Sequence, residues 1–210
     1  MRTLVLAAFL LGTSSSLQLA PRTTGCAASR PSRRLPALQF GLLNEMFKKS
    51  FGPPVVMGEE EIMRPKAHGT SETPVQEGLR WSCDRDTADR ICNFNRHYAE
   101  YSGYWESTDF LKQEPADSGD AQGAITFFDS NSGKPLFKAP IGRSWEQFVA
   151  ESKSHGWPSF RDEEVDWENV RILSDGEAVS VDGTHLGHNL PDRSGNRYCI
   201  NLVSIAGSPV

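Results

Sequence analysis

The sequence predicts a single α+β domain that is mainly β, with two small antiparallel sheets and short peripheral helices. The chain has 210 residues and is 38% hydrophobic, which is enough for one domain with a core of ordinary size plus tails. Aromatic residues make up 10%, and 18 glycines and 13 prolines favour a loop-rich β or α+β fold over a helical bundle. From residue 165 onward, short apolar runs alternate with turn residues, which is typical of antiparallel strands.

The N-terminus is predicted to be a targeting segment. Residues 1–19 contain Arg2, the apolar run LVLAAFLLG and then small polar residues, which is the layout of a secretory signal peptide. The apolar run has about ten residues, whereas a bilayer crossing needs roughly 20. A membrane anchor is therefore the weaker interpretation, and we expect the mature protein not to be membrane-bound.

Within residues 20–58, the stretch up to Leu43 is rich in Arg, Ser, Pro and Ala and contains no acid, as is typical of transit peptides. A signal peptide followed by such a segment resembles the two-part presequence of plastid proteins in algae whose plastids lie inside extra membranes. We therefore expect plastid localisation, with plain secretion as the alternative. Both interpretations treat residues 20–58 as a disordered segment and place the domain at 59–210.

Local patterns predict the elements of this domain. One helix is expected around Asp86 to Asn95. Residues 123–140, GAITFFDSNSGKPLFKAP, predict a β-hairpin that turns at 131–133. The segment SWEQFVAESKS predicts a short helix, because Ser144 can act as N-cap with Gln147 three residues later.

Three further runs predict strands in the last quarter of the chain. These runs are rich in β-branched residues and are bounded by Gly, Asp or Asn. They are VRIL at 170–173, AVSV at 178–181 and CINLVSI at 199–205. Together with the hairpin they give the several antiparallel strands of the expected fold.

The charge distribution argues against nucleic-acid binding. The formal net charge is -5, but residues 1–50 hold seven Arg or Lys against a single acid, Glu45, and so carry +6, which leaves -11 for the remainder. Binding to phosphate backbones relies on clustered Lys and Arg. An acidic folded part is a poor partner for them.

The cysteines are not typical of a metal site. Four occur, and Cys26 lies in the predicted presequence, which leaves Cys83, Cys92 and Cys199. An odd number argues against a pure disulfide scaffold, and no CxxC pair is present. A zinc site of four cysteines cannot be built from three, and a mixed site of Cys83, Cys92 and His97 has unusual spacing, so no metal is predicted.

Reactive side chains are concentrated in the last third of the chain. A cysteine is a useful nucleophile only as a thiolate, and a neighbouring cation lowers its pKa. If Cys199 lies on a strand, Arg197 and Asn201 share its face because side chains alternate with period two. From the residues alone, a cysteine such as Cys199 is more often a small buried hydrophobe than a nucleophile, and His185, His188 and Trp157 are also compatible with structural roles.

A resemblance favours the catalytic interpretation. GWPSF at 156–160, HLGH at 185–188 and RYCIN at 197–201 occur in the order and approximate spacing found in methionine-R-sulfoxide reductases. HGTSETPV at 68–75 and GKPLF at 133–137 are also similar to segments of that family. The resemblance spans most of residues 66–207 and implies a fold of two antiparallel sheets with short peripheral helices.

The resemblance also implies roles for single residues. Cys199 matches the catalytic cysteine, assisted by Arg197 and Asn201. His185, His188 and Asp192 match the polar residues that surround the sulfoxide oxygen in that family. Trp157 matches the aromatic wall that receives the sulfoxide methyl group, with Phe160 nearby.

The implied reaction is thiol-dependent reduction of methionine-R-sulfoxide, either free or in oxidised proteins. The Cys199 thiolate attacks the sulfoxide sulfur while His188 or His185 supplies a proton to the oxygen. Methionine leaves, and Cys199 becomes a sulfenic acid that a thioredoxin-like reductant returns to the thiol through a disulfide. The resemblance implies no metal or organic cofactor.

The sequence departs from the family at two places that matter for this cycle. His155 stands where many members have a resolving cysteine, and the two zinc-binding CxxC pairs of many relatives are missing. Cys83 and Cys92 are candidate substitutes for the resolving thiol, or else form a structural disulfide with each other. Residues 94–107, rich in Tyr and Trp, are expected to be a packed flap.

One further function remains open from the sequence. The domain is alternatively a non-enzymatic module with a reductase-like fold that binds a protein or a metal ion through His155, His185 and His188. Hydrolysis by a Cys–His pair is weaker, because nothing in the sequence resembles an oxyanion-hole loop.

Overall fold

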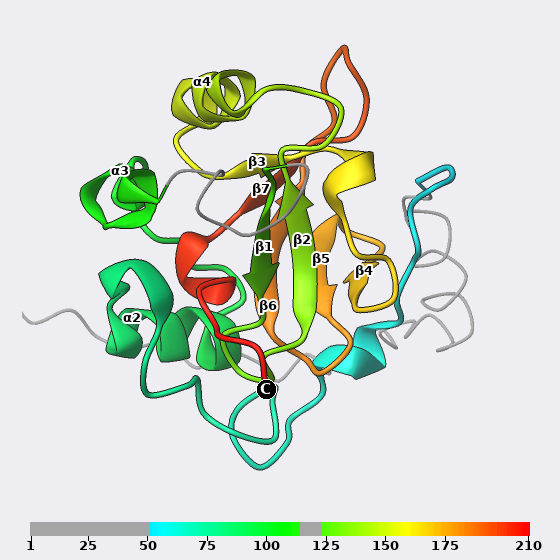
Figure 1. Ribbon diagram of the computed structural model, residues 1–210. Coiled ribbons are helices and arrows are strands. Elements are labelled where there is room, and N and C mark those ends of the chain that lie inside the picture. Colours follow the sequence, from blue (N-terminus) through cyan, green and yellow to red (C-terminus); the bar gives the residue numbers. More distant parts are fainter. Residues whose placement is uncertain (1–50, 114–122) are drawn as a thin grey trace, which may run out of the picture.

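Seven strands form two antiparallel sheets, and short helices surround them (Figure 1). The structure, a computed structural model, describes residues 51–113 and 123–210. The predicted signal peptide at 1–19 and most of the transit-like segment lie outside the described residues. The expected fold class, α+β with two small antiparallel sheets, is confirmed.

The smaller sheet is the predicted hairpin of β1 (Ile125–Phe128) and β2 (Pro135–Ala139). Its connection is held by Asp129, whose Oδ1 accepts a hydrogen bond from the Asn131 amide at 2.8 Å. Gly133 lies in the left-handed region at φ 73°, and a Cβ there would approach the Ser208 carbonyl oxygen to 2.6 Å. Glycine is therefore required at this turn.

The larger sheet has the strand order β3-β7-β6-β5-β4, and every neighbouring pair is antiparallel. Its members are β3 (Ser159–Phe160), β4 (Val170–Ile172), β5 (Glu177–Ser180), β6 (His185–Asn189) and β7 (Tyr198–Ile200). The predicted run CINLVSI is a strand only at its start, because a 3-10 helix, Leu202–Ser204, follows. Cys199 thus lies on an interior strand, between β3 and β6.

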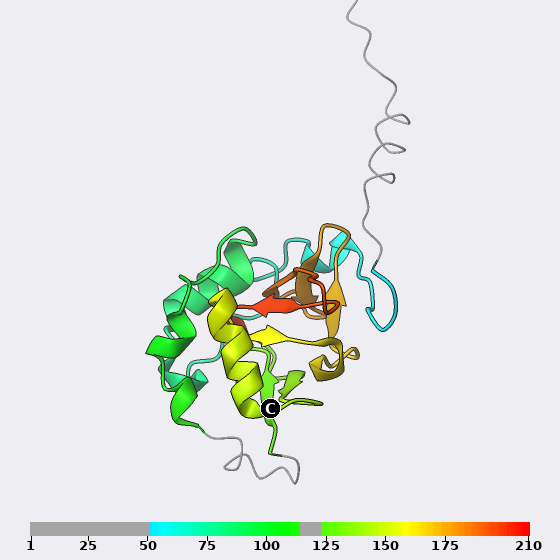
Figure 2. The same cartoon turned by 90° about the horizontal axis from the view of Figure 1, so that it is seen from above.

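Short helices lie at the periphery. They are α2 (Arg85–Asp89), which continues into a π-helical turn (Arg90–Phe94), α3 (Tyr104–Ser107) and α4 (Trp145–His155). In α4 the predicted capping box is formed, with Ser144 and Gln147 bonding each other's backbone amide groups. The helix ends at Gly156 in the left-handed conformation, and Figure 2 shows it beside β3 at the edge of the sheet.

Four other short 3-10 helices join these elements. They are Glu60–Met63, Arg80–Ser82, Phe110–Lys112 and Asp162–Glu164. Among the residues that the structure describes, no helix combines the length and the apolar character that crossing a membrane would require.

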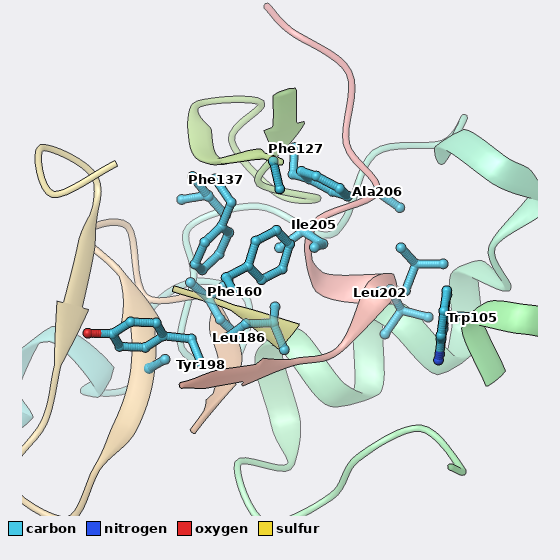
Figure 3. Packing of buried hydrophobic residues seen from close by; sticks show 14 of the residues in the cluster. Trp105, Phe127, Phe137, Phe160, Leu186, Tyr198, Leu202, Ile205 and Ala206 are labelled. Carbon is cyan, nitrogen blue, oxygen red and sulfur yellow. The ribbon is translucent and has the colours of Figure 1, made fainter. Parts of the chain in front are cut away.

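The core is built around aromatic rings between the two sheets (Figure 3). Phe160 of β3 stacks on Phe137 of β2, with ring centroids 4.4 Å apart, and meets Phe127 of β1 edge to face at 5.0 Å. Each such ring contributes roughly 1.5–3 kcal/mol by leaving water. Leu186, on the same sheet face, joins this cluster from β6.

Residues 51–58, predicted to precede the domain, pack onto the larger sheet. Met57 forms a parallel bridge with Ile172 of β4, the Gly58 amide donates to the Ile172 carbonyl at 2.9 Å, and the Ile172 amide donates to the Val56 carbonyl at 3.1 Å. Phe51 also packs against the core. The folded part therefore starts before Glu59, because this segment supplies hydrogen bonds that the edge strand β4 would otherwise lack.

Candidate functional site

A cavity of about 200 Å³ opens beside Cys199. Most of its wall comes from β6, β7 and the segment 96–99. Trp157 adds an indole ring to this wall, and Leu190 an aliphatic side chain at the rim. The lining residues are Arg96, His97, Tyr98, Ala99, Trp157, His185, Gly187, His188, Leu190, Cys199 and Asn201.

Both histidines of the HLGH motif line the cavity because β6 is irregular. Residues three apart on a regular strand point to opposite faces. The register between β5 and β6 shifts, so that Ala178 pairs with Gly187 but Val179 pairs with His185. This β-bulge places Leu186 in the core and leaves His185 and His188 on the cavity side, with ring centroids 5.7 Å apart.

Gly187 lets the two central strands approach each other closely. A Cβ at this position would lie 2.1 Å from the carbonyl oxygen of Cys199, a backbone atom that cannot move aside. His188 is the direct cross-strand partner of Cys199 in the β6–β7 register. Glycine in HLGH therefore brings this imidazole next to the thiol.

Cys199 is a half-buried free thiol. Burial raises its pKa above the ordinary value, and the charge and hydrogen bond of the neighbouring Arg197 guanidinium offset this only in part. The expected companion cation is thus present, but the thiol remains mainly protonated at neutral pH. Activation of Cys199 requires a group that takes its proton.

Arg197 and Asp192 support the thiol from outside the cavity. Arg197 is buried, and its Nε lies 3.5 Å from a carboxylate oxygen of Asp192, which in turn pairs with Arg161 at 2.8 Å. Hydrogen bonds from Arg161, the first of several causes, hold the pKa of Asp192 below its ordinary value. Asp192 does not line the cavity, contrary to the expectation that it surrounds the sulfoxide oxygen.

His185 is buried and is bonded to a carboxylate. Its Nδ1 lies 2.6 Å from Oε1 of Glu177 on the neighbouring strand β5. The sequence analysis did not single out Glu177, because contact between β5 and β6 depends on the sheet register. His188 differs, since burial first and the neighbouring His185 second lower its pKa, and it is neutral at pH 7.

The segment 96–99 forms part of the cavity wall. It belongs to residues 94–107, the expected packed flap. The next residue, Glu100, holds this segment in position. Its amide donates to Oδ1 of Asn201 at 3.2 Å, and its carbonyl accepts from Nε1 of Trp157 at 3.1 Å. The predicted site residues Asn201 and Trp157 are therefore both tied to a residue that the sequence analysis missed.

The Glu100 side chain is an unusual buried acid. It is 3% exposed, and its two oxygens accept hydrogen bonds from the amides of Leu202 and Val203 at 2.8 and 3.2 Å. Burial raises its pKa to about 8, although these two amides act in the opposite direction. No local pattern around Glu100 identifies it, because its partners are about one hundred residues away.

Phe160 was expected near the substrate methyl group, and that expectation is wrong. The ring is completely buried among the core aromatics (Figure 3). It is not one of the residues that line the cavity. Trp157, three residues earlier, does line it. The short strand β3 turns Phe160 toward the hairpin, where Phe137 and Phe127 surround it.

Cys83 and Cys92 are both free thiols, so the predicted structural disulfide between them is wrong. Cys92 is fully buried and contacts the Ser204 hydroxyl at 3.5 Å, and burial raises its pKa. Burial likewise raises the pKa of Cys83 to about 12. Neither lines the cavity, so either thiol would have to become exposed before it could react with Cys199.

The three histidines of the alternative metal site are not brought together. His155, at the end of α4, lies with Glu151 and Asp192, whereas His185 and His188 line the cavity. In the described part of the chain, that group alone gathers three ligand atoms within 4.8 Å. Its two carboxylates already share the Arg161 guanidinium, which makes a second cation there unfavourable.

Comparison with known proteins assigns no family to this chain. No protein-family model matches the sequence, and a search of the solved structures found no match. The motifs and the geometry of the cavity are therefore the features that point to a function.

Proposed function

We propose that this protein reduces methionine-R-sulfoxide, free or in oxidised proteins, with Cys199 as the nucleophile. The observation that carries the proposal is the cavity itself, in which Cys199 lies with two histidines, Trp157 and Asn201. The motifs GWPSF, HLGH and RYCIN, which resemble those of methionine-R-sulfoxide reductases, contain these residues. A thioredoxin-like reductant would complete the cycle.

The reaction is balanced in oxygen, protons and electrons. The thiol of Cys199 attacks the sulfoxide sulfur, and a proton reaches the sulfoxide oxygen. The sulfur–oxygen bond of the substrate breaks and a sulfur–oxygen bond to Cys199 forms, so the products are methionine and a sulfenic acid. Two thiols of the reductant then give a disulfide and water and restore the Cys199 thiol.

The walls of the cavity suit this substrate. Trp157 lies with its Nε1 hydrogen bonded to the Glu100 carbonyl, so its orientation is fixed while its ring faces the cavity. An aromatic ring favours contact with a methyl group or a thioether. The histidines and the Asn201 amide supply polar groups for the oxygen.

The test is epimer-specific turnover. Purified protein should convert the R epimer of a methionine-sulfoxide peptide, and not the S epimer, with dithiothreitol as reductant. Cys199→Ser should abolish this, whereas Cys83→Ser, a matched control outside the cavity, should retain it. Turnover that survives in Cys199→Ser rejects the proposal. No turnover together with stoichiometric metal in protein purified without added metal would favour the alternative histidine-based binding function.

A further inference from the structure

Glu177 is a buried carboxylate with two bonding partners, His185 and Arg96. Its side chain is 3% exposed. Its Oε1 bonds Nδ1 of His185 at 2.6 Å, and Nε of Arg96 donates to Oε1 and Oε2 at 3.1 and 3.0 Å. A buried charge is tolerated only with such compensation, so the three side chains form one unit.

This unit determines which ring nitrogen of His185 carries the proton. Burial acts to raise the pKa of Glu177, but the hydrogen bonds and charges of His185 and Arg96 outweigh it and hold the pKa below the ordinary value. Glu177 is therefore ionised at neutral pH and can only accept hydrogen bonds. Nδ1 of His185 must then be the donor, which leaves Nε2 as the nitrogen that can exchange a proton.

His188 lacks this support. Among the hydrogen bonds of the residues that the structure describes, none joins the His188 ring to a carboxylate. Burial first, and then the neighbouring His185, whose ring centroid is 5.7 Å away, lower the pKa of His188 and so disfavour its cation. The two cavity histidines are thus not equivalent, although the HLGH motif presents them symmetrically.

We propose that Glu177 is a positioning residue that fixes the Nδ1–H tautomer of His185 and makes its Nε2, rather than His188, the proton carrier for Cys199. This inference rests on the proposed reductase function. Nε2 takes the proton of the Cys199 thiol as the sulfur attacks, and Glu177 stabilises the resulting imidazolium. The same proton then passes to the sulfoxide oxygen, which leaves His185 neutral again and Cys199 as the sulfenic acid.

Arg96 connects this unit to the rest of the fold. Its Nη1 binds Glu60 of the first 3-10 helix, and the residue itself belongs to the cavity wall. The charged and titratable groups around His185 and His188 are therefore Glu177, Asp175, Arg96, His97, Tyr98 and Cys199. Of the two carboxylates, Glu177 bonds the His185 ring, whereas Asp175 acts on His188 only through its charge.

The first test measures the tautomer without any turnover. The ¹⁵N chemical shifts of the five histidines should show one ring, assigned by its loss in His185→Asn, that carries its proton on Nδ1 at pH 7. A proton on Nε2 of that ring would overturn the inference even if the protein is an active reductase. An Nδ1–H tautomer in a protein without sulfoxide turnover would instead point to failure of the proposed function.

The second test compares variants in the peptide-sulfoxide assay. Glu177→Gln should lower kcat/KM at pH 7 by about 10²-fold, within the usual contribution of proton transfer, mainly through kcat. Glu168→Gln, a matched change of an exposed acid, should have no effect. Because Glu177→Gln can also destabilise the fold, His185→Asn and His188→Asn are compared directly. A larger loss of kcat in His188→Asn than in His185→Asn would overturn the inference.

Discussion

Replacement of Glu100 by glutamine should change how the stability of the protein depends on pH. The Glu100 carboxyl is 3% exposed, and burial raises its pKa to about 8 from an ordinary value of 4.5. In the unfolded chain the same group ionises near its ordinary value. The folded state therefore keeps a proton that the unfolded state has lost over the whole interval between these two values.

The sign and size of the effect follow from this difference. The folded pKa is raised, so the stabilising contribution is complete below pH 4.5 and is lost as the pH rises to about 8. Each pKa unit corresponds to about 1.4 kcal/mol, so the difference between the ordinary pKa of 4.5 and the raised pKa of about 8 corresponds to roughly 5 kcal/mol of folding free energy. This is an upper limit for the contribution of Glu100. Glutamine has no proton to lose, and its similar shape keeps an oxygen that can accept from the Leu202 amide.

The assay is urea denaturation of wild type and Glu100→Gln at a series of pH values from 5 to 9. The free energy of unfolding of the variant should be lower at pH 5, because its amide group faces the Val203 amide. The difference in free energy of unfolding between wild type and Glu100→Gln should then decrease by several kcal/mol as the pH approaches 8. Parallel curves over this range would refute the raised pKa.

Three further predictions concern the site and its supporting core. Gly187→Ala should lower the thermal stability and abolish sulfoxide turnover, because its Cβ would collide with the Cys199 carbonyl, whereas Gly78→Ala, where nothing lies within 4 Å, should do neither. The rate of Cys199 alkylation by iodoacetamide should reach half its maximum above about pH 8.5, the ordinary cysteine value, and a midpoint below pH 8 would contradict the raised pKa. Phe160→Ala should cost about 3–5 kcal/mol of unfolding free energy in urea denaturation, and a loss below 1 kcal/mol would be incompatible with a fully buried ring.

Elements with local sequence signals were predictable. The hairpin of β1 and β2 follows from its turn residues, and the start of α4 follows from the capping box of Ser144 and Gln147, since in each case all partners lie within a few positions. The strand content of the last quarter was predictable for the same reason. The end of β7 was not, because Leu202 and Val203 are apolar like strand residues and yet belong to a 3-10 helix whose amides bond the Glu100 carboxylate.

The candidate site was predictable only where its residues lie in motifs. The sequence placed Cys199, His185, His188, Trp157 and Asn201 together, and all five line one cavity. The β-bulge that brings both histidines to the cavity side was not predictable, because a period-two pattern cannot show it.

The partners of these residues come from long-range contacts and were missed. Glu177 reaches His185 across the β5–β6 register, and Glu100 reaches Asn201 from a segment with no repeating pattern. The expectation for Phe160 was wrong for a similar reason, because its position on β3 directs the ring toward Phe137 in the core. Such contacts depend on how strands pair, and short motifs do not encode that.

The most direct test of the central claim is a single turnover without reductant. Reduced protein is incubated with a peptide that contains methionine-R-sulfoxide, and dimedone is then added to trap sulfenic acid before mass spectrometry. The account predicts one methionine formed per protein molecule, one dimedone adduct at Cys199 and neither product with the S epimer. Methionine formed while Cys199 stays an unmodified thiol, or an adduct that appears equally with the S epimer, would contradict it.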